Sequence, residues 1–157
     1  MSFTFQTILH RVEDTAKLSH ALATVLKPPA VLGLSGTLGV GKTQFIRSFA
    51  QALQIPSEEV TSPTYVLLQR YRATAEIYHL DFYRLEHASQ VWDLGIDELY
   101  EQCVYVLIEW AEKFPECLPE ERIDLLLTEM PDGSRGARLD SQGTKFDAVL
   151  QEVVQRL

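Results

Sequence analysis

The stretch Gly36-Thr37-Leu38-Gly39-Val40-Gly41-Lys42-Thr43 matches G-x-x-x-x-G-K-[ST], the pattern of a phosphate-binding loop (P-loop), at every fixed position. In such a loop, backbone N–H groups point inward to hold phosphate oxygens, which requires the conformational freedom of glycine and its lack of a Cβ atom. We expect Lys42 to reach the β- and γ-phosphates and the Thr43 hydroxyl to coordinate Mg²⁺. The stretch therefore predicts a nucleotide-binding protein whose phosphate contacts come from Gly36, Leu38, Gly39, Val40, Gly41, Lys42 and Thr43.

The residues on either side of the loop supply the context that this pattern requires. Ala30 to Ser35 is a short apolar run bounded by turn-forming residues, which predicts a buried strand leading into the loop. Apolar residues at helical spacing follow the loop: Phe45, Ile46, Phe49, Ala50 and Leu53. We therefore expect a helix that begins at the loop and presents its positive N-terminal end to the bound anion.

The rest of the chain alternates between helical and extended patterns. Helices are predicted over residues 14–26, with Asp14 or Thr15 as the cap, over 91–100 with a break at Gly95, and over 146–157. Strands are predicted over residues 65–71, 76–82, 104–108, 123–128 and 138–140, the first two as a hairpin. Thr144 and Asp147 resemble a capping box for the last helix. The prediction is a single α/β domain over residues 1–157, a P-loop NTPase-like three-layer fold with a mixed central sheet.

Composition narrows the class of protein. The chain has 157 residues, 46% of them apolar, and a net charge of −8 without a dense basic run, which argues against strong nucleic-acid binding by the chain alone. Residues 1–10 lack the pattern of a signal peptide, and the apolar run 104–108 is too short to cross a membrane. The two cysteines, Cys103 and Cys117, lack CxxC spacing. A cytoplasmic location is expected.

Two acidic residues are candidates for the catalytic machinery. Glu109 directly follows the apolar run 104–108, the place where P-loop enzymes keep a carboxylate of the magnesium shell. On the strand predicted over residues 76–82, His79, Asp81 and Tyr83 share one face. Asp81 is a candidate for the outer shell of the metal or for positioning a water, and His79 for orienting it; the alternative for this face is simple exposure to solvent.

The segment Thr61-Ser62-Pro63-Thr64 places hydroxyl groups around a stiff proline, between the P-loop helix and the next strand. A threonine in such a loop can sense a γ-phosphate, as switch loops do, and Thr64 is included among the nucleotide-binding candidates. The alternative is a turn made of ordinary turn-forming residues.

Four motifs taken together resemble the TsaE family: residues 36–43, Thr61-Ser62-Pro63-Thr64-Tyr65, His79-x-Asp81-x-Tyr83-Arg84 and Ile108-Glu109-Trp110-Ala111-Glu112-Lys113. They come in the order and spacing of the family, and the resemblance covers roughly residues 10–130.

The resemblance implies a small bacterial ATPase that uses ATP and Mg²⁺ and whose ATP cycle supports the proteins that form threonylcarbamoyladenosine next to the tRNA anticodon, without forming the threonylcarbamoyl group itself. The implied partners are the transferase proteins TsaD and TsaB. By the same resemblance, Lys42 and Thr43 hold phosphate and metal, Glu109 helps to hold Mg²⁺, and Asp81 belongs to the catalytic surface. Trp110 would pack near the nucleotide or the partner, and the corner at Asp14 and Thr15 would approach the base. Because Glu109 is committed to the metal and no arginine finger is evident, we expect slow hydrolysis that the partner stimulates.

Three other functions fit parts of the pattern. A GTPase needs an [NT]KxD element, which Thr144-Lys145-Phe146-Asp147 matches, although the adjoining DxxG match at residues 140–143 lies too close for that class. A small-molecule kinase needs an arginine-bearing lid, for which Arg135 and Arg138 are the candidates. A nucleotide-dependent assembly switch with negligible turnover needs only the binding loop.

Overall fold

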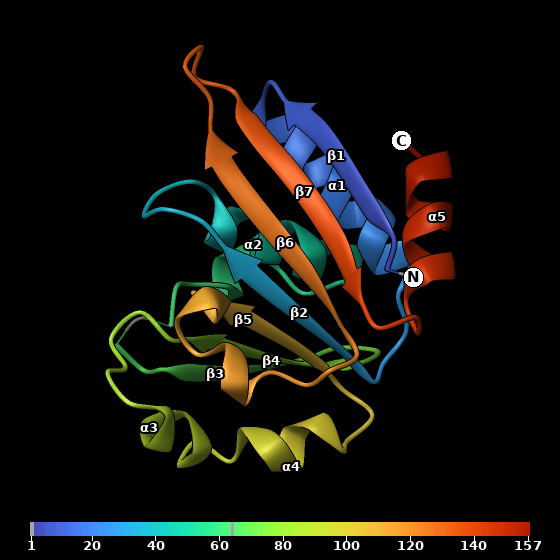
Figure 1. The fold of residues 1–157 in the computed structure, drawn as a ribbon. Coiled ribbons are helices and arrows are strands. Elements are labelled where there is room, and N and C mark those ends of the chain that lie inside the picture. The colour runs from blue at the N-terminus through green and yellow to red at the C-terminus, as the bar shows by residue number, and fades with distance from the viewer. Residues whose placement is uncertain (1, 64) are drawn as a thin grey trace.

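The computed structural model describes residues 2–63 and 65–157, and within them the chain forms a seven-stranded mixed sheet in the order β1-β7-β6-β2-β5-β4-β3 (Figure 1). The strands are β1 (Thr4–Leu9), β2 (Ala30–Ser35), β3 (Leu68–Arg72), β4 (Glu76–Asp81), β5 (Tyr105–Glu109), β6 (Arg122–Glu129) and β7 (Arg135–Gln142). The helices are α1 (Val12–Val25), α2 (Lys42–Ala52), α3 (Ala88–Trp92), α4 (Ile96–Tyr100) and α5 (Asp147–Gln155), with 3₁₀ turns η1 (Ser57–Glu59), η2 (Ala111–Lys113) and η3 (Pro115–Cys117).

The centre of the sheet is parallel. Strand β2 pairs in parallel with β5 on one side and β6 on the other, and β5 pairs in parallel with β4. The carboxyl ends of β2, β5 and β4 therefore lie side by side at one edge of the sheet, the usual place for a ligand in open α/β folds. Strands β3, β7 and β1 complete the sheet as antiparallel neighbours.

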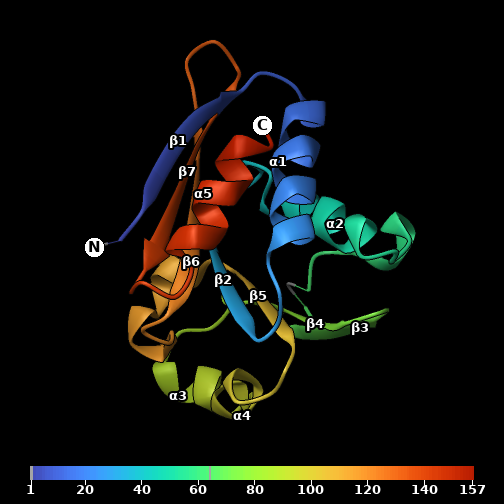
Figure 2. The same cartoon turned by 90° about the vertical axis from the view of Figure 1, so that its right-hand side faces the viewer.

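Helices cover the sheet on both faces, which confirms the three-layer α/β prediction. Buried residues of α1, α2 and α5 pack with one face of the strands, and residues of α3 and α4 pack with the other (Figure 2). On β2, Leu32 and Leu34 belong to the first core and Val31 to the second. This two-sided burial explains why the strand reads as a continuous apolar run.

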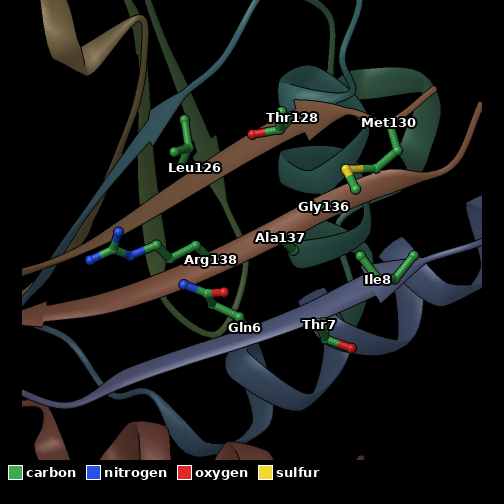
Figure 3. Close-up of a pocket in the computed structure, with 9 residues that line it drawn as sticks. All are labelled: Gln6, Thr7, Ile8, Leu126, Thr128, Met130, Gly136, Ala137 and Arg138. Atoms are coloured by element: carbon green, nitrogen blue, oxygen red, sulfur yellow. The ribbon is translucent and has the colours of Figure 1, made fainter.

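The layer on the α3 and α4 side leaves the outer part of the sheet uncovered. Ile8 of β1 and Leu126 of β6 are each 42% exposed there. Side chains of β1, β6 and β7 line a shallow hollow of about 480 Å³ on this open face (Figure 3).

Strand β1 was not predicted, and two strands, β3 and β7, begin three residues away from their predicted start. Strand β3 begins at Leu68 instead of residue 65, because Leu67 has φ +72° and its N–H bonds to the carbonyl of Pro63, which makes a turn. Strand β7 extends from Arg135 to Gln142, well beyond residues 138–140, because it pairs with β1 as well as β6. The break at Gly95 is confirmed: it separates α3 from α4 and has φ +75°.

Both predicted helix caps are wrong in detail. Helix α1 begins at Val12, with Arg11 as the cap, and the Asp14 carboxylate accepts hydrogen bonds from the backbone N–H groups of His10 and Arg11. These bonds lower the pKa of Asp14. Helix α5 has Phe146 at its cap, so Thr144 makes no capping box; the Asp147 carboxylate instead accepts a hydrogen bond from the N–H of Phe3, at 3.1 Å, and so ties the helix to the chain leading into β1.

Within the described part of the chain, we find no helix of the length and apolar character that a membrane crossing requires.

Candidate nucleotide-binding site

The P-loop joins β2 to α2, as its sequence predicts, and its glycines are required by the local geometry. Gly36 has φ +142°, and a Cβ atom there would lie 2.5 Å from the carbonyl oxygen of Leu127 and 2.8 Å from Cγ1 of Val40. Gly41, the cap of α2, has φ +121°. Residues with side chains rarely adopt such φ values, and at residue 36 a side chain has no space. The loop is thus pressed against β6 while its backbone turns into the first turn of α2.

Lys42 lies across this loop. Its side chain is 5% exposed, and Nζ donates hydrogen bonds to the carbonyls of Gly36 and Thr37 while lying 3.9 Å from the ring centroid of Trp110. Burial lowers the pKa of Lys42, and the nearby carboxylates of Glu112, Glu109 and Asp81 oppose that shift. A cation held over the glycine loop in this way is suited to receive phosphate oxygens.

Thr43 and Glu109 come together where α2 begins and β5 ends. The hydroxyl of Thr43 donates a hydrogen bond of 2.8 Å to Oε1 of Glu109, whose side chain is buried. Hydroxyl and carboxylate oxygens are the hard ligands that Mg²⁺ prefers, and Mg²⁺ sites in proteins typically use one or two carboxylates together with substrate phosphates. The pair therefore fits the metal predicted for these two residues.

Asp81 ends β4 and is the register partner of Glu109 in the parallel pair of β4 and β5. Its Oδ1 accepts a hydrogen bond from the N–H of Tyr83 at 2.8 Å, and its Oδ2 lies 3.4 Å from the hydroxyl of Ser62. The P-loop, Ser62, Asp81, Glu109 and Trp110 line one hollow of about 210 Å³. The structure thus gathers residues predicted from four separate motifs into one site.

His79 is a buried residue of β4, and its side chain contacts Glu109. Its Nε2 is 2.6 Å from Oε2 of Glu109, and its Nδ1 is 3.0 Å from the hydroxyl of Tyr71. The ring has no exposed surface, so the alternative of a solvent-exposed strand face is wrong. The prediction that Tyr83 continues the same strand is also wrong, because β4 ends at Asp81.

Tyr71 was missed by the sequence analysis. It lies on β3, and burial raises the pKa of its hydroxyl to about 12. The predicted hairpin placed Tyr71 on the strand that pairs with the strand of His79, and this was the signal by which Tyr71 could have been found.

Of the remaining candidates, Trp110 (φ +60°) stacks near Tyr83 with ring centroids 4.9 Å apart, whereas Thr64 lies outside the described residues.

A second hollow of about 300 Å³ lies on the other side of the P-loop. Thr15 and Gln44 line it together with Arg135, whose Nε donates a hydrogen bond of 3.0 Å to the carbonyl of Val40. Of the two residues predicted to approach the base, Thr15 lines this hollow, whereas the Asp14 carboxylate accepts a hydrogen bond from the backbone N–H of Arg11 at the start of α1.

The features that suggested other functions lie elsewhere. Lys145 of the GTPase-like element donates a hydrogen bond to the carbonyl of Pro29, just before β2 begins. The P-loop follows the opposite end of β2, so this element does not lie at the nucleotide site. The guanine-reading interpretation is therefore wrong. Arg135 and Arg138 lie on β7, not in a lid, and Arg138 pairs with Asp140 at 2.9 Å. The larger hollow on the open sheet face contains Arg138 but not the P-loop or the site carboxylates (Figure 3).

Comparisons with known proteins point to one family. The family model described as "Threonylcarbamoyl adenosine biosynthesis protein TsaE" matches residues 9–137. The tRNA threonylcarbamoyladenosine biosynthesis protein TsaE of Bacillus subtilis is 34% identical over 142 residues, which cover 90% of this chain and 88% of that protein. The protein of the same description from Rickettsia bellii is 37% identical over 131 residues, covering 83% and 90%. The crystal structure of Bacillus subtilis YdiB superposes with a TM-score of 0.83 at 28% identity, covering 99% of this chain and 97% of that one.

Proposed function

The chain belongs to the TsaE family, and from this premise we propose that it is an ATPase that binds ATP with Mg²⁺, hydrolyses it slowly, and supports the formation of threonylcarbamoyladenosine in tRNA. The observation that carries the proposal is the convergence of Lys42, Thr43, Asp81 and Glu109 on one hollow at the carboxyl ends of β2, β4 and β5. The family relationship supports the proposed role in threonylcarbamoyladenosine biosynthesis, and the residues of the site support the proposed ATP hydrolysis.

Phosphoryl transfer to water requires chiefly positioning and neutralisation of charge. The backbone N–H groups of the loop and the Lys42 ammonium would hold the phosphate oxygens, while Thr43 and Glu109 would hold the metal. Mg²⁺, when bound, neutralises charge on the β- and γ-phosphates. Asp81 lines the same hollow and is the remaining carboxylate available to orient a water, with Ser62 and the N–H of Tyr83 fixing its orientation.

The nucleoside would extend from the phosphates into the hollow beside Thr15, Gln44 and Arg135, which adjoins the other side of the P-loop. This placement follows from the loop itself, because the phosphate chain passes over the start of α2. The guanidinium of Arg135 is held to the P-loop carbonyl of Val40 and would form one wall of the base site.

The proposed slow rate follows from the cations of the site. Among the described residues that line the phosphate hollow, Lys42 is the single cation, and the guanidinium of Arg84 lies over the ring of Tyr65, 4.0 Å from its centroid. Transition-state charge on the γ-phosphate is therefore incompletely neutralised by this chain. We propose that TsaD-like and TsaB-like partners complete the site and accelerate turnover.

The test is ATP hydrolysis by the purified chain with Mg²⁺, alone and with a TsaD–TsaB pair, using Lys42→Ala as the control. Weak turnover that rises with the pair and disappears in the variant supports the proposal. Fast turnover by the chain alone contradicts the incomplete site, and a phosphorylated small-molecule product would identify a kinase instead. Nucleotide binding with no turnover in the presence of the pair would identify an assembly switch.

A further inference from the structure

Buried contacts of His79 connect Glu109, on one side of the ring, with a loop at the rim of the site, on the other side. One carboxylate oxygen of Glu109 accepts the hydroxyl of Thr43, at 2.8 Å, and the other lies 2.6 Å from Nε2 of His79. On its far side the ring is 3.0 Å from the hydroxyl of Tyr71. Both oxygens of the carboxylate are therefore partnered by side chains from different elements, α2 and β4.

From this arrangement we propose that His79 and Tyr71 are positioning residues, a buried relay that holds the Glu109 carboxylate in its orientation toward Thr43 and connects it to the loop before β3. The inference rests on the proposed function, since it concerns the carboxylate assigned to the metal. Residues that hydrogen-bond to a metal ligand orient it, and their loss typically lowers metal affinity about 10–100-fold.

A histidine at this place needs a reason beyond packing. Its neighbours along β4 on the core faces, Ile77 and Leu80, are apolar and fully buried, and an apolar side chain at residue 79 would need no polar partners. An imidazole buried there requires hydrogen bonds at its nitrogens, and the two it has fix the rotation of the ring. The ring in turn restricts the rotation of the carboxylate.

The proton positions follow from the donors available. Burial raises the pKa of Tyr71 to about 12, so near neutral pH its hydroxyl keeps its single proton, for which Nδ1 of His79 at 3.0 Å and Oε1 of Gln69 at 2.6 Å are competing acceptors. A carboxylate oxygen accepts hydrogen bonds, so in the contact of 2.6 Å between Nε2 of His79 and Oε2 of Glu109 the imidazole is the donor and Nε2 carries the proton.

The relay reaches the loop through Tyr71. Its hydroxyl lies 2.6 Å from Oε1 of Gln69 and 3.4 Å from the carbonyl of Thr61, and the Gln69 amide donates to the Thr61 hydroxyl at 3.2 Å. The single proton of Tyr71 serves one acceptor at a time. A shift of Thr61 and Gln69 therefore changes whether that proton supports His79, which gives the loop a physical connection to the metal carboxylate.

The first test compares matched tyrosine variants in calorimetric ADP binding at increasing Mg²⁺. Tyr71→Phe removes the hydroxyl of the relay, and Tyr105→Phe removes a buried hydroxyl that bonds to the carbonyl of Leu26, away from the site. We expect all proteins to bind ADP alike in EDTA, while the Mg²⁺ concentration for half-maximal tightening rises about 10-fold in Tyr71→Phe and is unchanged in Tyr105→Phe. An equal midpoint in the two variants would overturn the relay.

Substitution of the histidine gives a rescue test in the same assay. His79→Leu removes the donor to Glu109 and is expected to raise the Mg²⁺ midpoint at least about 10-fold, whereas His79→Gln, whose amide can reach the same oxygen, stays within about 3-fold of the natural chain. Equal midpoints for the leucine and glutamine variants would contradict the positioning role. Thermal melting of each variant reports whether it is folded.

A readout without nucleotide or metal separates failure of the relay from failure of the proposed function. In ¹⁵N NMR spectra of the free protein, we expect His79 to carry a proton on Nε2 and the Nδ1 shift to change in Tyr71→Phe. A proton on Nδ1 alone would overturn the relay. Absence of ADP binding by the natural chain would overturn the proposed function while leaving this spectroscopic result to decide the relay.

Discussion

Replacement of Gly36 by alanine tests whether the P-loop is shaped by its contact with β6. The new Cβ atom would lie 2.5 Å from a backbone oxygen, that of Leu127, and 2.8 Å from Cγ1 of Val40, so it cannot be accommodated by moving the end of a flexible side chain alone. The residue would also have to keep φ +142°, a value that essentially only glycine adopts.

The expected loss has two parts. Backbone strain of this kind costs about 1–3 kcal/mol, and forcing extra atoms into a packed place costs about 1–3 kcal/mol more. The free energy of unfolding of Gly36→Ala should therefore fall by about 2–6 kcal/mol, a large share of the roughly 5–15 kcal/mol that a domain has. The variant is also expected to lose nucleotide binding, because relief of the clash moves the loop away from β6.

Gly39→Ala is the matched control in the same loop. Gly39 has φ +79°, and a Cβ atom there would meet nothing within 4 Å, so only the left-handed backbone penalty of about 1–2 kcal/mol applies. Urea unfolding followed by circular dichroism measures both variants, and calorimetry measures ADP binding. If the free energy of unfolding of Gly36→Ala lies within about 0.5 kcal/mol of that of the natural chain, or exceeds that of Gly39→Ala, the steric reasoning is refuted.

Three further predictions concern single groups. Burial lowers the pKa of Lys42 below the usual 10.5, and only the charged amine attracts phosphate. ADP affinity should therefore be constant near neutral pH and begin to fall below pH 10.5 as the pH rises. Calorimetry from about pH 7 to about pH 10 checks this, and an affinity that does not change over this range would contradict it. Arg135→Met removes the bond to the Val40 carbonyl and should weaken ADP binding about 3–10-fold, the value of one hydrogen bond, whereas unchanged affinity would show that the loop does not depend on it. Asp147→Ala removes the acceptor of the Phe3 N–H and should lower the free energy of unfolding by about 0.5–1.5 kcal/mol and speed hydrogen exchange of that amide, with Asp147→Asn, which keeps an acceptor, as the control.

Features that depend on local sequence were predictable. The P-loop, the buried strands at residues 30–35 and 104–108, and the helix after the loop are each specified by residues that are adjacent in the chain, and the structure confirms them. The parallel arrangement of these strands then places Glu109 and Asp81 at the same edge as the loop. The grouping of the candidate residues therefore followed from their positions at strand ends.

Strand β1 was not predictable in the same way. Its inward positions are Phe5, Thr7 and Leu9, and Ile8 faces outward, so the alternation of apolar and polar residues is broken. Only pairing with β7, more than 120 residues away in the sequence, makes this segment a strand. Intrinsic strand preference is weak compared with such tertiary context.

The contact of His79 with Glu109 depends on the register between β4 and β5, and that of Tyr71 depends on the register of the hairpin. A shift by one residue would turn each side chain to the other face. The sequence analysis predicted His79 to lie near the candidate carboxylates, but its contact with Glu109 in particular became evident only in the structure. The capping error at Thr144 has a similar cause, because Asp147 is used by Phe3 from the far end of the chain.

The contact between the P-loop and β6 has a consequence for how the protein is made. The loop lies at residues 36–43, but the carbonyl against which Gly36 packs belongs to Leu127, and the guanidinium that holds Val40 belongs to Arg135. During synthesis the motif leaves the ribosome roughly 90 residues before these supports, an interval of several seconds at about 5–20 residues per second. We therefore expect nascent chains to carry the complete motif without a formed phosphate site, and to begin binding nucleotide only once β6 and β7 have emerged.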